Sequence, residues 1–244
     1  QRKIDIFDST LRDGAQGQGI SFSLEDKLKI VRVLDDLEVT YIEAGNPGSN
    51  PKDMEFFKRL KGERLKNSKI VAFGSTRRPN TEVGEDKNIK NLLLAETSVV
   101  TIFGKSWDFQ VKEILKTSLD ENLNMIGDTI KYLVSKNKEV IFDAEHFFDG
   151  YKQNKEYAIS TVKIAAEAGA KSVVLCDTNG GTLPDEIRNI TKEVVNIIGG
   201  NVGIHCHDDM GMAVANSIVA AQVGANQIQG TFIGIGERCG NANL

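Results

Sequence analysis

A strand-and-helix unit repeats eight times along the 244 residues of this chain. Short runs of β-branched and apolar residues alternate with longer stretches in which apolar residues recur at helical spacing. Units of roughly thirty residues are what a (β/α)8 barrel requires. The expected strands cover residues 4–9, 40–45, 69–74, 98–104, 139–146, 172–178, 201–207 and 226–234.

The segments between these strands have the spacing and the boundaries of amphipathic helices. In residues 23–39, Leu28, Val31 and Leu34 follow helical spacing, and Ser23 precedes a charged first turn as an N-cap. Two later segments end at Gly-Ala, a common helix ending. Helical patterns also cover residues 50–61, 86–96, 108–136, 154–170, 184–200 and 210–225.

The repeat predicts an α/β fold with one catalytic (β/α)8 TIM-barrel domain over residues 1–244. A doubly wound open sheet is the structural alternative, and eight units would make it a large one. After the eighth expected strand the chain supplies only ERCGNANL. We therefore expect a barrel truncated near its last helix, with the C-terminal regions of a longer enzyme absent.

Composition and charge exclude several classes of protein. The formal net charge of −4 leaves no broad basic surface for nucleic acid. No apolar run is long enough to cross a bilayer. The three cysteines are widely spaced and form no CxxC pair, so neither a disulfide framework nor a cysteine-rich zinc site is expected. The chain is therefore expected to be cytoplasmic, with no nucleic-acid or membrane partner.

Polar side chains stand at the carboxyl end of nearly every expected strand, which is where barrel enzymes place their chemistry. Asp8, Glu43, Glu145 and Asp177 alternate with apolar neighbours, and we expect them to face the barrel axis. Like charges there would repel without a cation or an arginine among them. The alternative, for any single residue, is that it is simply the first solvated residue after its strand.

The stretch HCHDDMGM indicates a metal site at the end of the seventh expected strand. Side chains at i and i+2 of a strand share a face, so His205 and His207 point the same way while Cys206 faces the helix layer. Asp13, in the turn after the first strand, is the most attractive carboxylate partner. Such a site accepts manganese, magnesium, zinc or cobalt. His146, the third histidine, is at least equally well explained as a structural residue.

The motifs DSTLRDGAQ, HCHDD and GIGERCGNANL resemble a family of metal-dependent, HMG-CoA-lyase-like barrels. That family includes 2-isopropylmalate synthase, homocitrate synthase, citramalate synthase and 3-hydroxy-3-methylglutaryl-CoA lyase. The resemblance covers essentially the whole chain. Within the family, YIEAGNPGSNPKD, FGSTRR, FGKSWD, DAEHFFDGY and LCDTNGGTLP are most similar to the citramalate-synthase branch, which condenses acetyl-CoA with pyruvate.

The resemblance implies two groups of site residues. The implied metal ligands are Asp13, His205, His207 and Asn241. The residues implied to bind the 2-oxo acid are Arg12, Gln16, Glu43, Glu145 and Thr178, and Arg12 and Glu145 are also implied to act in catalysis. Arg12 matches the arginine that polarises the 2-oxo group. Thr178 matches a hydroxyl that binds the substrate carboxylate.

The resemblance also implies an activity, its co-substrates and an assembly. The implied enzyme is a homodimeric acyltransferase that uses a divalent metal ion and acetyl-CoA, with its general base expected beyond residue 244. Ile233 and Asp208 depart from the asparagines that many relatives carry, which puts a substrate or loop contact in doubt at Ile233. Cys239 is expected to be a small buried residue, because its surroundings do not match the reactive loop of the lyases.

Four alternatives to a citramalate synthase remain open. They are a 2-isopropylmalate synthase, a homocitrate synthase, a carbon-carbon lyase, and a catalytically incomplete metal-binding barrel.

Overall fold

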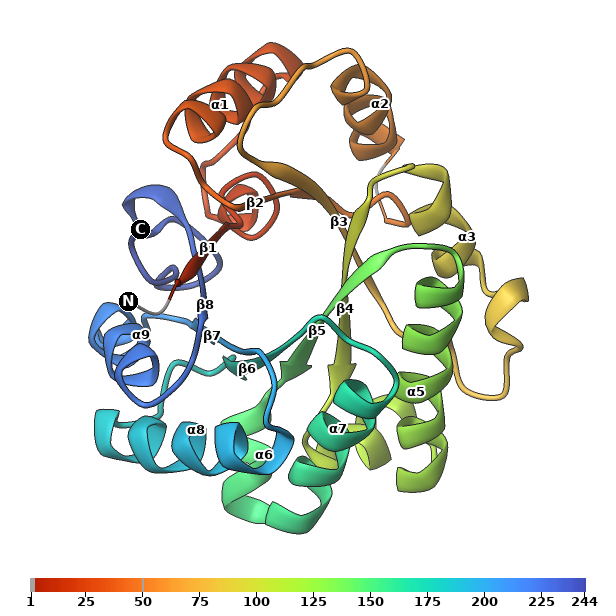
Figure 1. The fold of residues 1–244 in the computed structure, drawn as a ribbon, viewed down its shortest axis with the longest axis vertical. Coiled ribbons are helices and arrows are strands. Elements are labelled where there is room, and N and C mark those ends of the chain that lie inside the picture. Colours follow the sequence, from red (N-terminus) through yellow and green to blue (C-terminus); the bar gives the residue numbers. More distant parts are fainter. Residues whose placement is uncertain (1–2, 50) are drawn as a thin grey trace.

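A computed structural model describes residues 3–49 and 51–244 and contains a closed barrel of eight parallel strands (Figure 1). The strands follow chain order around the barrel, and β8 closes it by pairing with β1 at Phe7 and Gln229. The predicted TIM barrel is confirmed, and an open sheet is excluded. The strands are β1 (Asp5–Asp8), β2 (Tyr41–Gly45), β3 (Lys69–Ser75), β4 (Val99–Lys105), β5 (Glu139–Glu145), β6 (Ser172–Asp177), β7 (Val202–Cys206) and β8 (Gln227–Gly230).

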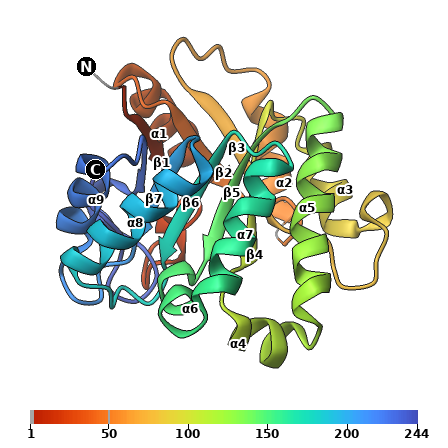
Figure 2. The ribbon, with the colours of Figure 1, turned by 60° about the horizontal axis from the view of Figure 1, so that its bottom comes forward.

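Helices form the outer ring of the barrel (Figure 1), and the turned view also shows them outside the strands (Figure 2). The Ser23 hydroxyl accepts from the amide of Asp26, and the Asp26 carboxylate accepts from the amide of Ser23, so the predicted N-cap is a full capping box. No helix in the described ranges is long and apolar enough to span a membrane. The helices are α1 (Leu24–Asp36), α2 (Pro51–Leu60), α3 (Lys87–Leu94), α4 (Asp108–Gln110), α5 (Leu119–Ser135), α6 (Phe147–Gln153), α7 (Lys155–Glu167), α8 (Pro184–Ile198) and α9 (Ala213–Gln222).

Strand alternation divides the buried side chains into an inner and an outer cluster. The outer cluster fills the space between strands and helices and contains Cys206, as predicted from its place between the two histidines. The inner cluster closes the barrel interior below its mouth, so the interior is a packed core and not a pore. Its members are Phe7, Tyr41, Val71, Val99, Ile141, Val174 and Cys176.

Two of the four carboxylates expected at the barrel axis lie on the other side of the sheet. Phe7 and Cys176 point inward, so their neighbours Asp8 and Asp177 point toward the helices. Asp8 accepts hydrogen bonds from the amide and hydroxyl of Thr10, and Asp177 accepts the corresponding pair from Thr182. Burial raises the pKa of Asp8 to about 6 and also raises the pKa of Asp177.

Strand β8 is shorter than the predicted residues 226–234. After Gly230 the chain turns, because the C-terminal segment returns over the strand end and Thr231 pairs with Asn243 instead of extending the barrel. A Cβ at Gly230 would lie 2.5 Å from the carbonyl oxygen of Ala242, which explains the glycine at this crossing. Ile233 has a φ of +54° and is 80% exposed, so it cannot continue the strand.

Candidate active site

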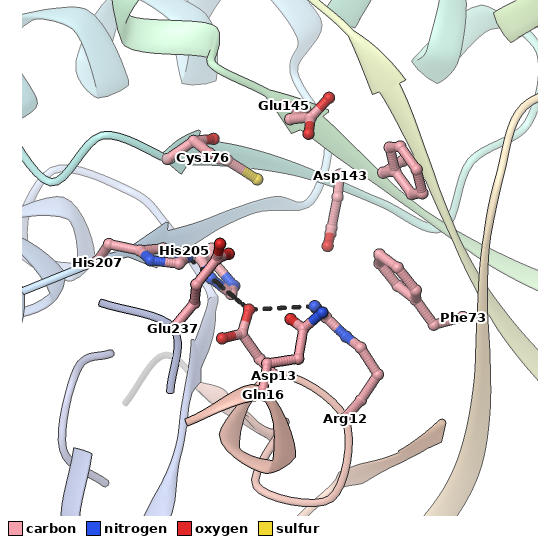
Figure 3. Close-up of a pocket in the computed structure, with 12 residues that line it drawn as sticks. Arg12, Asp13, Gln16, Phe73, Asp143, Glu145, Cys176, His205, His207 and Glu237 are labelled. Carbon is pink, nitrogen blue, oxygen red and sulfur yellow. Dashed lines mark hydrogen bonds and ion pairs between the residues drawn. The ribbon is translucent and has the colours of Figure 1, made fainter. Parts of the chain in front are cut away.

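The barrel mouth holds a cavity of about 230 Å³ at the carboxyl ends of the strands (Figure 3). The turn Gly14–Gln16 forms one wall, and the ends of β3 to β7 form most of the rest. The cavity therefore lies at the carboxyl ends of the strands, where the sequence predicts the catalytic residues. Its lining residues are Arg12, Asp13, Gln16, Phe73, Phe103, Asp143, Glu145, Cys176, Thr178, His205, His207 and Glu237.

Asp13, His205 and His207 form a candidate metal centre in this cavity. Their ligand atoms all lie within 4.8 Å of one another, and each imidazole Nε2 lies 3.8 Å from Oδ2 of Asp13 (Figure 3). Two metal-ligand bonds of about 2.1 Å can bridge that separation. Asn241 adds a buried Oδ1 that has no hydrogen-bond partner among the described residues. The donor set thus fits a divalent cation.

The charges in this centre suit ligation. Burial alone would raise the pKa of Asp13, but Arg12 and the two imidazoles hold that pKa well below its usual range. Burial and the neighbouring His205 lower the pKa of His207 to about 4. At neutral pH the carboxylate is therefore ionised and the His207 ring is neutral, and these are the forms that bind metal.

The two histidines have different partners at Nδ1. Nδ1 of His205 lies 2.8 Å from Oε1 of Gln229, an acceptor, so the proton sits on Nδ1 and the Nε2 lone pair faces Asp13. Nη2 of Arg238 also lies 3.2 Å from Nδ1 of His207, but its two hydrogens are donated at 2.8 Å to Oδ2 of Asp209 and at 2.7 Å to the carbonyl oxygen of Thr178. The Arg238 contact therefore does not assign the tautomer of His207.

Arg12 lies beside the candidate metal centre and is held on three sides. Its Nε donates to Oε2 of Glu43 at 2.7 Å, and Nη1 donates to Oδ2 of Asp13 at 3.1 Å. The guanidinium carbon lies 3.9 Å above the ring centre of Phe73. Burial alone would lower the pKa of Arg12, but Glu43 and Asp13 raise it, so its charge is permanent.

The returning C-terminal segment brings Asn241 to Asp13. Nδ2 of Asn241 donates to Oδ1 of Asp13 at 2.8 Å and to the carbonyl oxygen of Ile235. A Cβ at Gly236 would lie 2.1 Å from Nδ2 of Asn241, so only glycine permits this approach. Gly240 has a φ of +94° and its Cβ position is 2.0 Å from the carbonyl oxygen of Gly234, so glycine is required there too.

The other predicted substrate-binding residues have different positions. Gln16, Glu145 and Thr178 line the cavity, whereas Glu43 is fully buried beneath Arg12 and does not line it. The Thr178 hydroxyl accepts from the amide of His146 at 2.8 Å, which leaves the hydroxyl proton to donate elsewhere. Glu145 is ion-paired with Lys105. Glu43 contacts Arg12 and Ser9, so any contact between Glu43 and substrate stays a prediction.

Five cavity residues were not predicted as site residues: Phe73, Phe103, Asp143, Cys176 and Glu237. The rings of Phe73 and Phe103 stack with centres 5.2 Å apart. Burial, followed by repulsion from Glu43, raises the pKa of Asp143 to about 7. Asp143 could have been found, because it stands two residues before Glu145 and therefore shares its face. The aromatic pair carries no comparable sequence signal.

The predictions for Cys239 and His146 have different outcomes. Cys239 is exposed, so the prediction of a buried residue is wrong: the tight turn at Gly240 leaves its side chain outside the core. His146 is not among the residues that line the cavity; it packs against Trp107, with its Nδ1 3.2 Å from Oδ2 of Asp149. It does not belong to the candidate metal centre.

Comparison with known proteins places the chain in a family. The model of the HMGL-like family matches residues 3–244. The chain belongs to the HMGL-like family. Solved structures of this type share the fold: the HMG-CoA lyase of Bacillus subtilis superposes with a TM-score of 0.81 at 22% identity, covering 100% of this chain and 83% of that one.

Among relatives of this HMGL-like chain are synthases. It is 59% identical over 243 residues to the (R)-citramalate synthase of Aquifex aeolicus and 54% identical over 241 residues to that of Geobacter sulfurreducens. Each match covers 99% of this chain but 46% of the relative. The homocitrate synthase AksA of Methanopyrus kandleri is 36% identical, with 99% of this chain and 58% of the relative covered. The chain thus spans about half the length of the citramalate synthases it matches.

Proposed function

We propose that this barrel is the catalytic domain of an acyltransferase that condenses acetyl-CoA with a 2-oxo acid, pyruvate in the first place, to give citramalate. The observation that carries the proposal is the placement of Arg12 beside Asp13, His205 and His207 in one cavity. A fixed positive charge next to a divalent-cation site suits a reaction that develops negative charge on a ketone oxygen.

Each residue has a role that its geometry supports. Asp13, His205, His207 and Asn241 hold the cation, which supplies Lewis-acid chemistry to the ketone and carboxylate oxygens of the 2-oxo acid. Arg12, which Glu43 and Asp13 hold in place, stabilises the developing alkoxide. Thr178 donates its free hydroxyl proton to the substrate carboxylate. Glu145 and Gln16 contact the 2-oxo acid from opposite sides of the cavity.

Pyruvate is favoured by the wall of the cavity. Phe73 and Phe103 line the cavity from β3 and β4 with stacked rings, so the methyl group of pyruvate would meet aromatic carbon there. The higher identity to citramalate synthases than to a homocitrate synthase supports the same choice. Pockets of this type discriminate by about 1–3 kcal/mol per methylene.

The remaining expectations concern the whole enzyme. We propose a homodimer that uses acetyl-CoA as co-substrate. The three cysteines are all free, which suits the reducing cytoplasm that we propose as its location.

The activity is tested with full-length enzyme, acetyl-CoA and Mn²⁺. We expect free thiol to appear with pyruvate and the product to have the mass of citramalate. A larger kcat/KM for 2-oxoisovalerate or 2-oxoglutarate than for pyruvate would overturn the substrate. Binding of Mn²⁺ and pyruvate without any thiol release would overturn the reaction.

A further inference from the structure

A chain of buried hydrogen bonds runs across the barrel interior behind the candidate metal centre. Nε2 of Gln229, on β8, donates to Oδ1 of Asp143, on β5, at 3.0 Å. Oε1 of the same amide lies 2.8 Å from Nδ1 of His205, which is the neighbour of Gln229 in the β7–β8 register. Gln229 is fully buried, and neither it nor Asp143 is among the proposed ligands. Both therefore need an explanation other than metal contact or solvation.

The two bonds leave the Gln229 amide a single orientation. Asp143 accepts and cannot donate when ionised, so Nε2 must face it and Oε1 must face His205. A protonated Asp143 carries a donor as well, but Oε1 of Gln227 lies 3.4 Å from the same Nε2 and accepts there in either protonation state of Asp143. His205 must then donate through Nδ1, which leaves the lone pair of Nε2 directed at Asp13. If the amide were reversed, its NH2 would face Nδ1 and place the proton on the wrong ring nitrogen.

We propose that Gln229, oriented by Asp143, is a positioning residue that sets the His205 tautomer and ring orientation for metal binding. The proposal rests on the function proposed above only in its use of the cation, because the tautomer is a property of the metal-free chain. Residues one bond behind a ligand typically contribute 10- to 100-fold to metal affinity. Asp143 acts through Gln229, so an acceptor at position 143 is what matters, not its charge.

Three substitutions separate this role from packing. Gln229→Met keeps the volume but removes the acceptor, and we expect its Mn²⁺ affinity by calorimetry to fall about 10- to 100-fold. Asp143→Leu frees the Gln229 amide to turn, so we expect a comparable loss of Mn²⁺ affinity. Asp143→Asn still presents an oxygen to Nε2 of Gln229, so its loss of Mn²⁺ affinity should be clearly smaller. Thr191→Val is the control, since the Thr191 hydroxyl is buried on α8 and has no hydrogen-bond partner among the described residues.

Imidazole ¹⁵N spectra of the metal-free protein test the tautomer directly, because the chain has only three histidines. We expect His205 to carry its proton on Nδ1 in the wild type and to lose this preference in Gln229→Met. A wild-type His205 protonated on Nε2, or a folded Gln229→Met with wild-type Mn²⁺ affinity, would overturn the proposal. A wild type that binds no Mn²⁺ but has the expected tautomer would count against the proposed function instead.

Discussion

Arg12 is held between two carboxylates and an aromatic ring, and these contacts fix where its charge acts. Glu43 takes the Nε side of the guanidinium and Asp13 takes Nη1. The Ser9 hydroxyl donates to the same Oε2 of Glu43 at 2.5 Å, so Glu43 is itself held. The planar guanidinium of an arginine can donate to both carboxylates and stack on Phe73 at once, whereas a lysine ammonium cannot.

Arg12→Lys should therefore lower turnover far more than metal affinity. Its ammonium keeps one positive charge but loses the planar donor geometry that spans Glu43 and Asp13, and losing one charge-stabilising donor typically costs about 10²- to 10³-fold in kcat. Steady-state kinetics with pyruvate and calorimetry with Mn²⁺ measure the two effects separately. A large loss of Mn²⁺ affinity with unchanged kcat at saturating metal would contradict the electrophilic role.

Asp143 should make the metal-free protein less stable as the pH rises. Its pKa is about 7 in the folded chain and about 3.9 when unfolded, so between these values the folded state binds more protons. Its contribution to stability is complete below pH 4 and is lost as the pH rises through 7, with a slope of at most about 1.4 kcal/mol per pH unit. Urea unfolding with a chelator, at pH 5 and pH 7.5, should show a smaller decrease for Asp143→Asn than for the wild type. Equal decreases would show that Asp143 does not titrate in this range.

At the scale of elements, the site depends on a segment that returns over the barrel after β8. Ala242 donates its amide to the carbonyl of Cys206, and Asp208 donates to the carbonyl of Gly240, so the segment is fastened to the end of β7. His207 and Asn241 face each other across this bridge. The last residues of the described chain thus complete a centre that begins at Asp13.

Gly236→Ala tests this arrangement. The added methyl would overlap Nδ2 of Asn241 and push it away from Asp13. We expect Mn²⁺ affinity to fall by about tenfold or more, as for other residues that orient metal ligands. Gly181→Ala is the matched control, because a Cβ there meets nothing within 4 Å. Wild-type affinity in Gly236→Ala would mean that Asn241 does not support the centre.

The periodicity of apolar residues predicted which segments form strands and helices. It predicted less well which face of a strand points inward and where an element ends. Alternation shows that His205 and His207 share a face, but it does not show which face is inward, which is why Asp8 and Asp177 were assigned wrongly. The eighth strand was predicted too long because its end depends on a contact with Ala242, which no local pattern carries. α6 was not predicted, since FFDGYKQ is short and contains a glycine.

At the scale of the whole molecule, the candidate metal centre spans the seam where the barrel closes. Asp13 follows β1 and Asn241 follows β8. These two strands pair only when the barrel closes. The two histidines add β7 to the same centre. A cation would therefore link segments more than two hundred residues apart, whose contact is lost on unfolding.

Metal binding should accordingly stabilise the whole barrel. A ligand that binds only the folded state at 100 times its Kd adds about 2.7 kcal/mol, and for a chain of this size each kcal/mol raises Tm by roughly 2–4 °C. Calorimetric melting with Mn²⁺ and with chelator should differ by about 5–10 °C on these figures. His207→Ala should abolish the difference, whereas His146→Asn, which tolerates the positive φ at that position, should retain it. If Mn²⁺ raised the Tm of His207→Ala as much as it raises that of the wild type, the cation would be bound elsewhere and the seam would not be its site.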